Sequence, residues 1–154
     1  MTLSESYRDS LARTLPELRI LRLDLDSTAK AGSHTEILKA FQSGAADLLL
    51  GTQMVSKGFD FPKVTLAAVL HIDGVLNLPD YQSSEKAFQL IVQTAGRAGR
   101  GQRPGQVYIQ TFFPDNPLLM RAEHYDYEGF YRQEILIRQA LGYPPFNKAA
   151  RILV

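Results

Sequence analysis

The 154-residue sequence contains no cysteine, which excludes disulfide bonds, thiolate metal sites and cysteine nucleophiles. Its three histidines, at positions 34, 71 and 124, do not have the spacing of metal ligands. No apolar run is long enough to span a membrane and no secretory signal is present, so we expect a soluble, cytoplasmic protein without membrane contact. Any chemistry must therefore come from other side chains.

The sequence also lacks an excess of charge of either sign, because it has 17 lysines and arginines and 16 acids, for a net charge of +1. A role in nucleic-acid binding could therefore rest only on local clusters of positive charge. Hydrophobic residues make up 45% of the chain, which is enough for the core of one compact domain.

The hydrophobic pattern predicts helices that alternate with short apolar strands. We expect helices at 3–15, 33–44, 83–99, shortly after Pro114 and at 125–141, and strands at 19–26, 47–52, 64–73 and 105–113. Ser33 and Glu36 form a capping-box pattern, Gly44 should end the second helix, and "GYPPF" should end the last one before a final strand. This order predicts an α/β fold, a mainly parallel sheet with helices on both faces. Sites in such sheets form at the carboxyl ends of strands, here after Asp26, Gly51, Asp73 and Phe112.

The segment "QTAGRAGRGQRPG" interleaves arginines with glycines at the end of the helix predicted at 83–99. On a continuous helix Gln93, Arg97 and Arg100 would share one face, and guanidinium groups there would suit phosphate. Gly96 and Gly99 would let a ligand or a second domain approach the backbone. The opposite face, which should pack on the sheet, carries Ala87, Leu90, Ile91 and Ala98. The alternative is a solvated helix face with a glycine-rich end.

A second segment, "GTQMVSKGFDFPKV", follows the strand predicted at 47–52. Thr52 and Gln53 offer hydrogen bonds where α/β sites form, Gly58 permits an unusual backbone angle, and Asp60 could accept from a sugar hydroxyl. The alternative is an ordinary connecting loop in which Asp60 is a turn residue.

Together the two segments point to one protein family more specifically than either does alone. "LLLGTQMVSKGFDFPKV" resembles motif V of superfamily 2 helicases, and "QTAGRAGR" resembles their motif VI, Q-x-x-G-R-x-G-R. "LPDYQSSEKAFQL", "PGQVYIQTFFPDNPLL" and "LGYPPFNKAA" extend the similarity, over nearly the whole chain, to the primosomal replication-restart DNA helicases. The sequence departs from that family at Leu25, Gln82 and Lys86, where arginine is usual, and at His71, where an acid is usual.

This resemblance implies a RecA-like fold, with the second (C-terminal) helicase lobe at 1–124 and, at 125–154, a helical extension that leads into a C-terminal domain. It also implies roles for individual residues. Arg97 and Arg100 would reach the ATP phosphates, Arg100 the γ-phosphate, and Gln93 would link nucleotide state to lobe position. The residues beside the nucleotide would be Asp60, at a ribose hydroxyl, Gly58 and Gly96. The DNA backbone would be contacted by Thr52, Gln53 and Lys57.

The sequence has no G-x-x-x-x-G-K-[ST] phosphate loop and no acidic Mg²⁺-binding box. The resemblance assigns both to the first lobe of the same chain, which would hold most of the ATP and its Mg²⁺, so this chain alone is expected to be inactive. The cysteine-rich zinc module of the family is expected only in a longer parent protein, and the ending "KAARILV" reads as a cut end. Expected partners are single-stranded and forked DNA, primosome proteins and single-stranded-DNA-binding protein.

Two alternatives stay open on the sequence. The chain could be a lobe of another superfamily 2 translocase, such as a RecG-like one, although "LPDYQSSEKAFQL" and "LGYPPF" argue against this. It could also be a non-catalytic binding module that uses the arginine-rich helix face for a partner.

Overall fold

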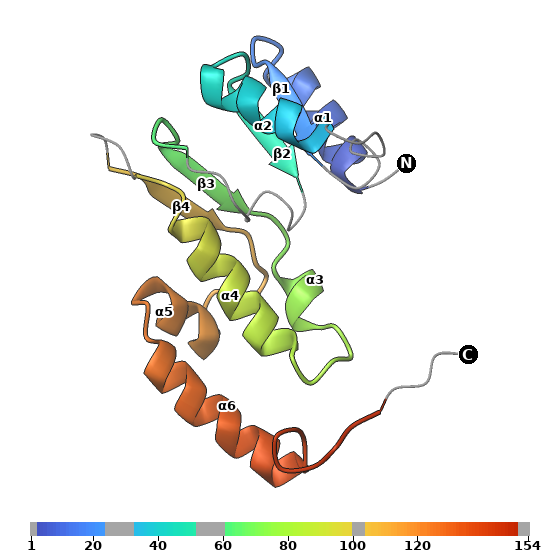
Figure 1. Cartoon of the computed structure of the whole chain (residues 1–154), viewed down its shortest axis with the longest axis vertical. Coiled ribbons are helices and arrows are strands. Elements are labelled where there is room, and N and C mark those ends of the chain that lie inside the picture. The colour runs from blue at the N-terminus through green and yellow to red at the C-terminus, as the bar shows by residue number, and fades with distance from the viewer. Residues whose placement is uncertain (1–2, 24–32, 52–60, 100–103, 151–154) are drawn as a thin grey trace. The chain divides into compact units, whose positions relative to one another are not determined.

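A computed structural model describes residues 3–23, 33–51, 61–99 and 104–150 (Figure 1). Their helices and strands are α1 (Leu3–Thr14), β1 (Ile20–Leu23), α2 (Ser33–Ser43), β2 (Leu48–Gly51), β3 (Leu66–Val69), α3 (Asp73–Leu76), α4 (Ser83–Ala95), β4 (Gln106–Ile109), α5 (Pro117–Glu123) and α6 (Tyr127–Leu141). The chain divides into two compact units, Met1–Lys63 and Val64–Val154. No helix in the described part of the chain is both long and apolar enough to cross a membrane.

The first unit is built on the parallel pair β1–β2, in which Ile20 lies opposite Leu48 and Leu23 opposite Gly51. Helices α1 and α2 both pack against β1. Leu23 is completely buried, and the aromatic rings of Phe41 and Phe61 meet edge to face at 5.2 Å. The apolar strands predicted at 19–26 and 47–52 therefore exist and form the parallel pair expected of an α/β fold.

Gly44 ends α2 as predicted. Its φ of +85° is a left-handed conformation that glycine adopts without strain, and a Cβ there would meet no atom within 4 Å. The predicted capping box at the other end of this helix depends on the side chain of Ser33, which lies outside the described part of the structure.

The second unit is built on the parallel pair β3–β4, with Leu66 opposite Gln106 and Val69 opposite Ile109. Helix α4 packs on both strands and also contacts α3 and α5, while α6 packs on α5 (Figure 1). Side chains from these elements form one core, whose buried members are Val69, Ile72, Ala87, Phe88, Ile91, Leu118, Ala122 and Phe130. The predicted boundary between a lobe at 1–124 and an extension at 125–154 stays a prediction; Phe130 of α6 shares the core of this unit.

Strand β3 is shorter than the strand predicted at 64–73. It ends at Val69, and His71 has a φ of +53°, a left-handed angle that a strand cannot continue through. Ile72 is then completely buried, and the short helix α3, which the apolar pattern does not predict, begins at Asp73. At the other end of the unit, the described residues 147–150 contain no part of the predicted final strand.

Candidate functional site

Helix α4 carries one apolar and one polar face, as the helical period predicts. Ala87 and Ile91 are buried against the strands, and Phe88 beside them is buried too. Gln93 lies exposed near the end of the helix. The start of the helix is fixed by Asp80, which accepts from the Gln82 amide at 3.0 Å and pairs with the Lys86 ammonium at 2.5 Å. The axis of α4 is thus held at both its buried face and its first turn.

The prediction that this helix continues to residue 99 is wrong. The last α-helical bond is donated by the Gly96 amide to the Val92 carbonyl, and the helix ends at Ala95. The Arg97 amide instead donates to Thr94, three residues back, and Gly99 has a φ of +76°. Because the backbone leaves the α-helical path before Gly99, helical spacing does not place Arg100 on the face of Gln93. We call residues 96–99, including Arg97, the arginine turn.

The arginine turn is attached to the start of the β3–β4 pair. The Gly99 amide donates to the Val64 carbonyl at 3.0 Å, and the Gln106 amide donates to the Thr65 carbonyl at 2.8 Å. The first bond ties the arginine turn, and the second ties the first residue of β4, to the two residues that precede β3. The turn therefore lies at the amino ends of these strands, whereas the predicted chemistry-bearing loops lie at the carboxyl ends.

On the side where a side chain would lie, Gly99 does not leave the room for a ligand that the sequence predicted. A Cβ at Gly99 would lie 2.4 Å from the Gly105 nitrogen and 2.9 Å from the Gly105 Cα. The space beside Gly99 is filled by the backbone of this same chain. Gly96 lies partly buried in the same turn.

The carboxyl ends of β3 and β4 are joined by Asp73, a buried acid at the start of α3. Its carboxylate accepts from the Thr111 hydroxyl at 2.9 Å and from the Phe112 amide at 3.1 Å. Burial raises the pKa of Asp73, but the hydrogen bonds from Thr111 and from the Phe112 amide outweigh it, and the net pKa lies below its ordinary value. Sequence reasoning placed a site loop here but did not select Asp73, whose only sequence signal is an acid directly after an apolar strand.

Several predicted site residues lie outside the described residues, so the structure places none of their side chains. They are Thr52, Gln53, Lys57, Gly58, Asp60 and Arg100. The segment 52–60 begins after Gly51, at the carboxyl end of β2, and is followed by Phe61, whose ring packs on α2. Among residues 3–23, 33–51, 61–99 and 104–150, no group of three histidines or acids could hold a metal ion.

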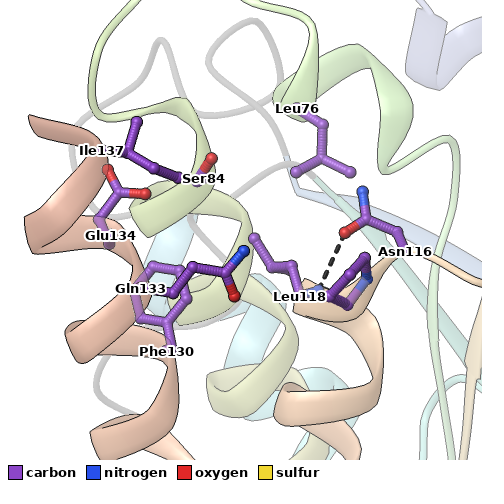
Figure 2. A pocket seen from close by; sticks show the side chains of 9 residues that line it. Leu76, Ser84, Asn116, Leu118, Phe130, Gln133, Glu134 and Ile137 are labelled. Carbon is purple, nitrogen blue, oxygen red and sulfur yellow. Dashed lines mark hydrogen bonds between the residues drawn. The ribbon is translucent and has the colours of Figure 1, made fainter. Parts of the chain in front are cut away.

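Two cavities of the second unit lie beside α5. The smaller, of about 110 Å³, is shown in Figure 2, where Asn116 caps α5 by accepting from the Leu118 amide at 2.9 Å. Two polar side chains at its rim are engaged, since Gln133 accepts from Arg121 and Glu134 pairs with Arg138. The larger cavity, of about 440 Å³, is bounded mainly by apolar side chains of α4, β4 and α5. Neither cavity is lined by an arginine or lysine, so neither has the chemistry of a phosphate site.

Comparison with known families favours the helicase-lobe interpretation of the sequence over a non-catalytic binding module. The model of the helicase conserved C-terminal domain matches residues 3–102, a span that includes Gln93, the arginine turn and Arg100. The chain belongs to this helicase family. The match confirms the predicted α/β, RecA-like helicase lobe.

Similarity to individual proteins extends beyond the family match. The chain is 44% identical to Replication restart protein PriA of Bacillus subtilis over 98% of its own length and 19% of that protein. It is also 44% identical to the PriA of Synechocystis, over 94% of the chain and 17% of the relative, and 48% identical to that of Chlamydia muridarum, over 97% and 20%. The chain thus spans about a fifth of the length of these relatives and matches their C-terminal helicase lobe.

Proposed function

We propose that this chain is the second lobe of an ATP-dependent DNA helicase that acts in replication-fork restart and primosome assembly. The observation that carries the proposal is the 44% identity to Replication restart protein PriA over 98% of the chain. The match covers 151 of the 154 residues, so the matched region includes the arginine turn and the elements that hold it, from α4 to β4. A lobe of this kind supplies half of a nucleotide site and completes it against a first lobe.

The arginine turn has the donors that a nucleotide phosphate needs. Arg97 is partly buried in the turn and carries a planar, permanently charged guanidinium group, and the Gln93 amide lies four residues earlier on α4. Cations placed where charge develops on a transferring phosphoryl group stabilise that charge. In this proposal Arg97 and Arg100 supply such cations, Arg100 at the γ-phosphate, and Gln93 couples nucleotide state to lobe position. The Mg²⁺ ion and most nucleotide contacts belong to the first lobe.

The remaining assignments follow from the same family. Asp60 would bind a ribose hydroxyl, and Gly58 and Gly96 would each contact the nucleotide. The DNA backbone would be contacted by Thr52, Gln53 and Lys57. The substrates would be single-stranded and forked DNA, and the partners primosome proteins and single-stranded-DNA-binding protein. Zinc would be bound only by a separate module of the longer protein.

The test of this proposal is the turnover number of the longer helicase with Arg100→Ala and Arg100→Lys. We expect kcat of DNA-stimulated ATP hydrolysis to fall by about 10³-fold with alanine, as for arginine fingers in related phosphoryl transfer. Lysine should rescue poorly because a point charge does not reproduce the planar fork. Melting temperature and affinity for single-stranded DNA should stay near those of the wild type, since surface substitutions shift stability by about 0.5 kcal/mol or less.

Arg132→Ala is the matched control, because Arg132 is an exposed arginine on α6 that pairs with Glu128 at 2.5 Å. Its kcat should equal that of the wild type. A near-normal kcat for Arg100→Ala would remove Arg100 from the catalytic residues and give the role to Arg97.

A further inference from the structure

The backbones of Gly105 and Gly99 are in close contact, and neither residue has space for a side chain. A Cβ at Gly105 would lie 2.4 Å from the carbonyl carbon of Ala98 and 2.7 Å from its Cβ, and closer still to the Gly99 nitrogen. A Cβ at Gly99 would in turn lie 2.4 Å from the Gly105 nitrogen. The two nearest neighbours on each side are backbone atoms, and the Ala98 Cβ is bonded directly to the backbone, so none of them can swing aside as the tip of a flexible side chain can.

Hydrogen bonds join Gly99 and Gln106, the residue after Gly105, to a third stretch of backbone. The Gly99 amide is bonded to the Val64 carbonyl, and the Gln106 amide, next to Gly105, is bonded to the Thr65 carbonyl. Gly99 also needs its left-handed φ of +76° to make this contact. The arginine turn is therefore wedged between the residues that precede β3 and the residue that precedes β4.

We propose that Gly105 is a positioning residue for Arg97 in the nucleotide site, an inference that rests on the proposed function. Gly105 lies outside the Q-x-x-G-R-x-G-R segment, which ends at position 100. It acts through Ala98 and Gly99, the two residues that follow Arg97. A methyl group at Gly105 would have to push these backbone atoms by about 1 Å to reach ordinary contact distance, and a displacement of about that size can cost on the order of 10²-fold in rate.

The experiment measures ATP turnover by the longer helicase with Gly105→Ala, at saturating ATP and single-stranded DNA. We expect kcat to fall by about 10- to 100-fold while the affinity for single-stranded DNA is unchanged. Hydrogen exchange followed by mass spectrometry should show faster exchange in a peptide that contains the Gly99 amide, because its bond to Val64 is weakened. A purely stabilising role for Gly105 would not change kcat at a temperature where the variant is fully folded.

Gly99→Ala disturbs the same contact through the other glycine. The double variant, Gly99→Ala with Gly105→Ala, tests whether the two glycines act together. Because both substitutions break one contact, the loss of kcat in the double variant should be smaller than the product of the single losses. Gly44→Ala is the matched control for backbone strain, since Gly44 also has a left-handed φ but open space around it. That variant should lose stability and keep its kcat.

The two levels of the proposal can fail separately. If Arg97→Ala and Arg100→Ala both keep the wild-type kcat, the proposed function is wrong. If the arginine variants lose turnover but Gly105→Ala stays within twofold of the wild type, the positioning role is overturned. A Gly105→Ala protein that folds at no temperature would also overturn it, because the inferred effect is confined to the arginine turn.

Discussion

Arg19 and Asp47 join the starts of β1 and β2 through side chains and backbone. The Arg19 guanidinium donates to both carboxylate oxygens of Asp47, at 2.8 and 2.9 Å, and the Arg19 amide donates to the same carboxylate at 3.0 Å. The side-chain hydrogen bond from Arg19, followed by the backbone bond, lowers the pKa of Asp47 to about 2. The ionised form of Asp47 is therefore favoured in the folded chain.

This pair predicts a specific acid dependence of stability. A carboxylate whose pKa is lower in the folded chain than its unfolded value of about 3.9 stabilises the fold above about pH 4, and this contribution is lost as the pH falls toward 2. Asp47→Asn should lower the denaturant midpoint at pH 7, and its difference from the wild type should shrink as the pH falls from about 4 to 2. Urea unfolding at pH 7, 4 and 2.5 measures this.

Asp9→Asn is a suitable control for the Asp47 prediction, because the Asp9–Arg8 ion pair is similarly exposed but joins two neighbours in the sequence. Asp47, in contrast, also accepts from the Arg19 backbone amide and links the starts of two strands. An exposed pair between sequence neighbours should contribute little to stability. A difference between Asp47→Asn and the wild type that stays constant from pH 7 to 2.5 would contradict the assignment.

Some residues of the second unit could be assigned from the sequence and others could not. Apolar spacing identified Ala87 and Ile91 as buried, since burial on a helix repeats with its period. It did not identify Asp73, whose hydrogen-bond partners lie 38 and 39 residues away, or the contact between Gly99 and Gly105. These depend on how β3 and β4 pair, which no local pattern contains.

At the scale of elements, the start of α4 was predictable and its end was not. The sequence pattern predicts that this helix begins at Ser83 or Ser84, and α4 begins at Ser83. Beyond that end, the Gly99 amide donates to the Val64 carbonyl, 35 positions earlier in the chain, and not to a carbonyl one helical turn back. The pattern of neighbouring residues does not contain this long-range bond, so it predicts a longer helix.

Helix α6 is joined to the rest of the second unit by an aromatic contact. The rings of Phe130 and Phe88 stack with centroids 4.4 Å apart and an angle of 13° between their planes, and both side chains are buried. Arg138 adds a second link, because it pairs with Glu85 of α4 at 2.9 Å and with Glu134 of its own helix at 3.0 Å. Burial lowers the pKa of Arg138, but the hydrogen bonds that Arg138 donates to Glu134 and Glu85 raise it by more, so the net pKa is raised and the charge is retained.

We therefore expect Phe88→Ala to destabilise the second unit by about 3–5 kcal/mol, the usual cost of removing a buried phenylalanine ring. The free energy of unfolding in urea measures the loss, and protease cleavage near residues 127–141 should increase because α6 loses its partner. Phe113→Ala is the control: Phe113 is 64% exposed, and its loss should shift stability by about 0.5 kcal/mol or less. Equal effects of the two substitutions would contradict the role of the stack.

At the scale of the whole molecule, the order of the motifs predicted more than the periodicity did. Helices and strands alone left a non-catalytic binding module open, and "LPDYQSSEKAFQL" and "LGYPPF" were the segments that argued against another superfamily 2 translocase. "QTAGRAGR" after "GTQMVSKGFDFPKV" predicted a helicase lobe, and the family match over residues 3–102 confirms it. Of the predicted site, Gln93 and Arg97 lie in the described residues, and Arg100 and residues 52–60 lie outside them.

The half-site proposal predicts that this chain alone does not hydrolyse ATP. Its sequence supplies the arginines of "QTAGRAGR" but no phosphate loop, so positioning of the nucleotide and most of its charge compensation would be missing. Positioning contributes much of the rate enhancement of phosphoryl transfer. Phosphate release measured with malachite green, with and without single-stranded DNA, should stay at background for the purified chain. The longer helicase, assayed in parallel, should turn over and should respond to DNA. Robust turnover by the chain alone, unaffected by Arg97→Ala together with Arg100→Ala, would instead show that the arginine turn is not half of a shared site.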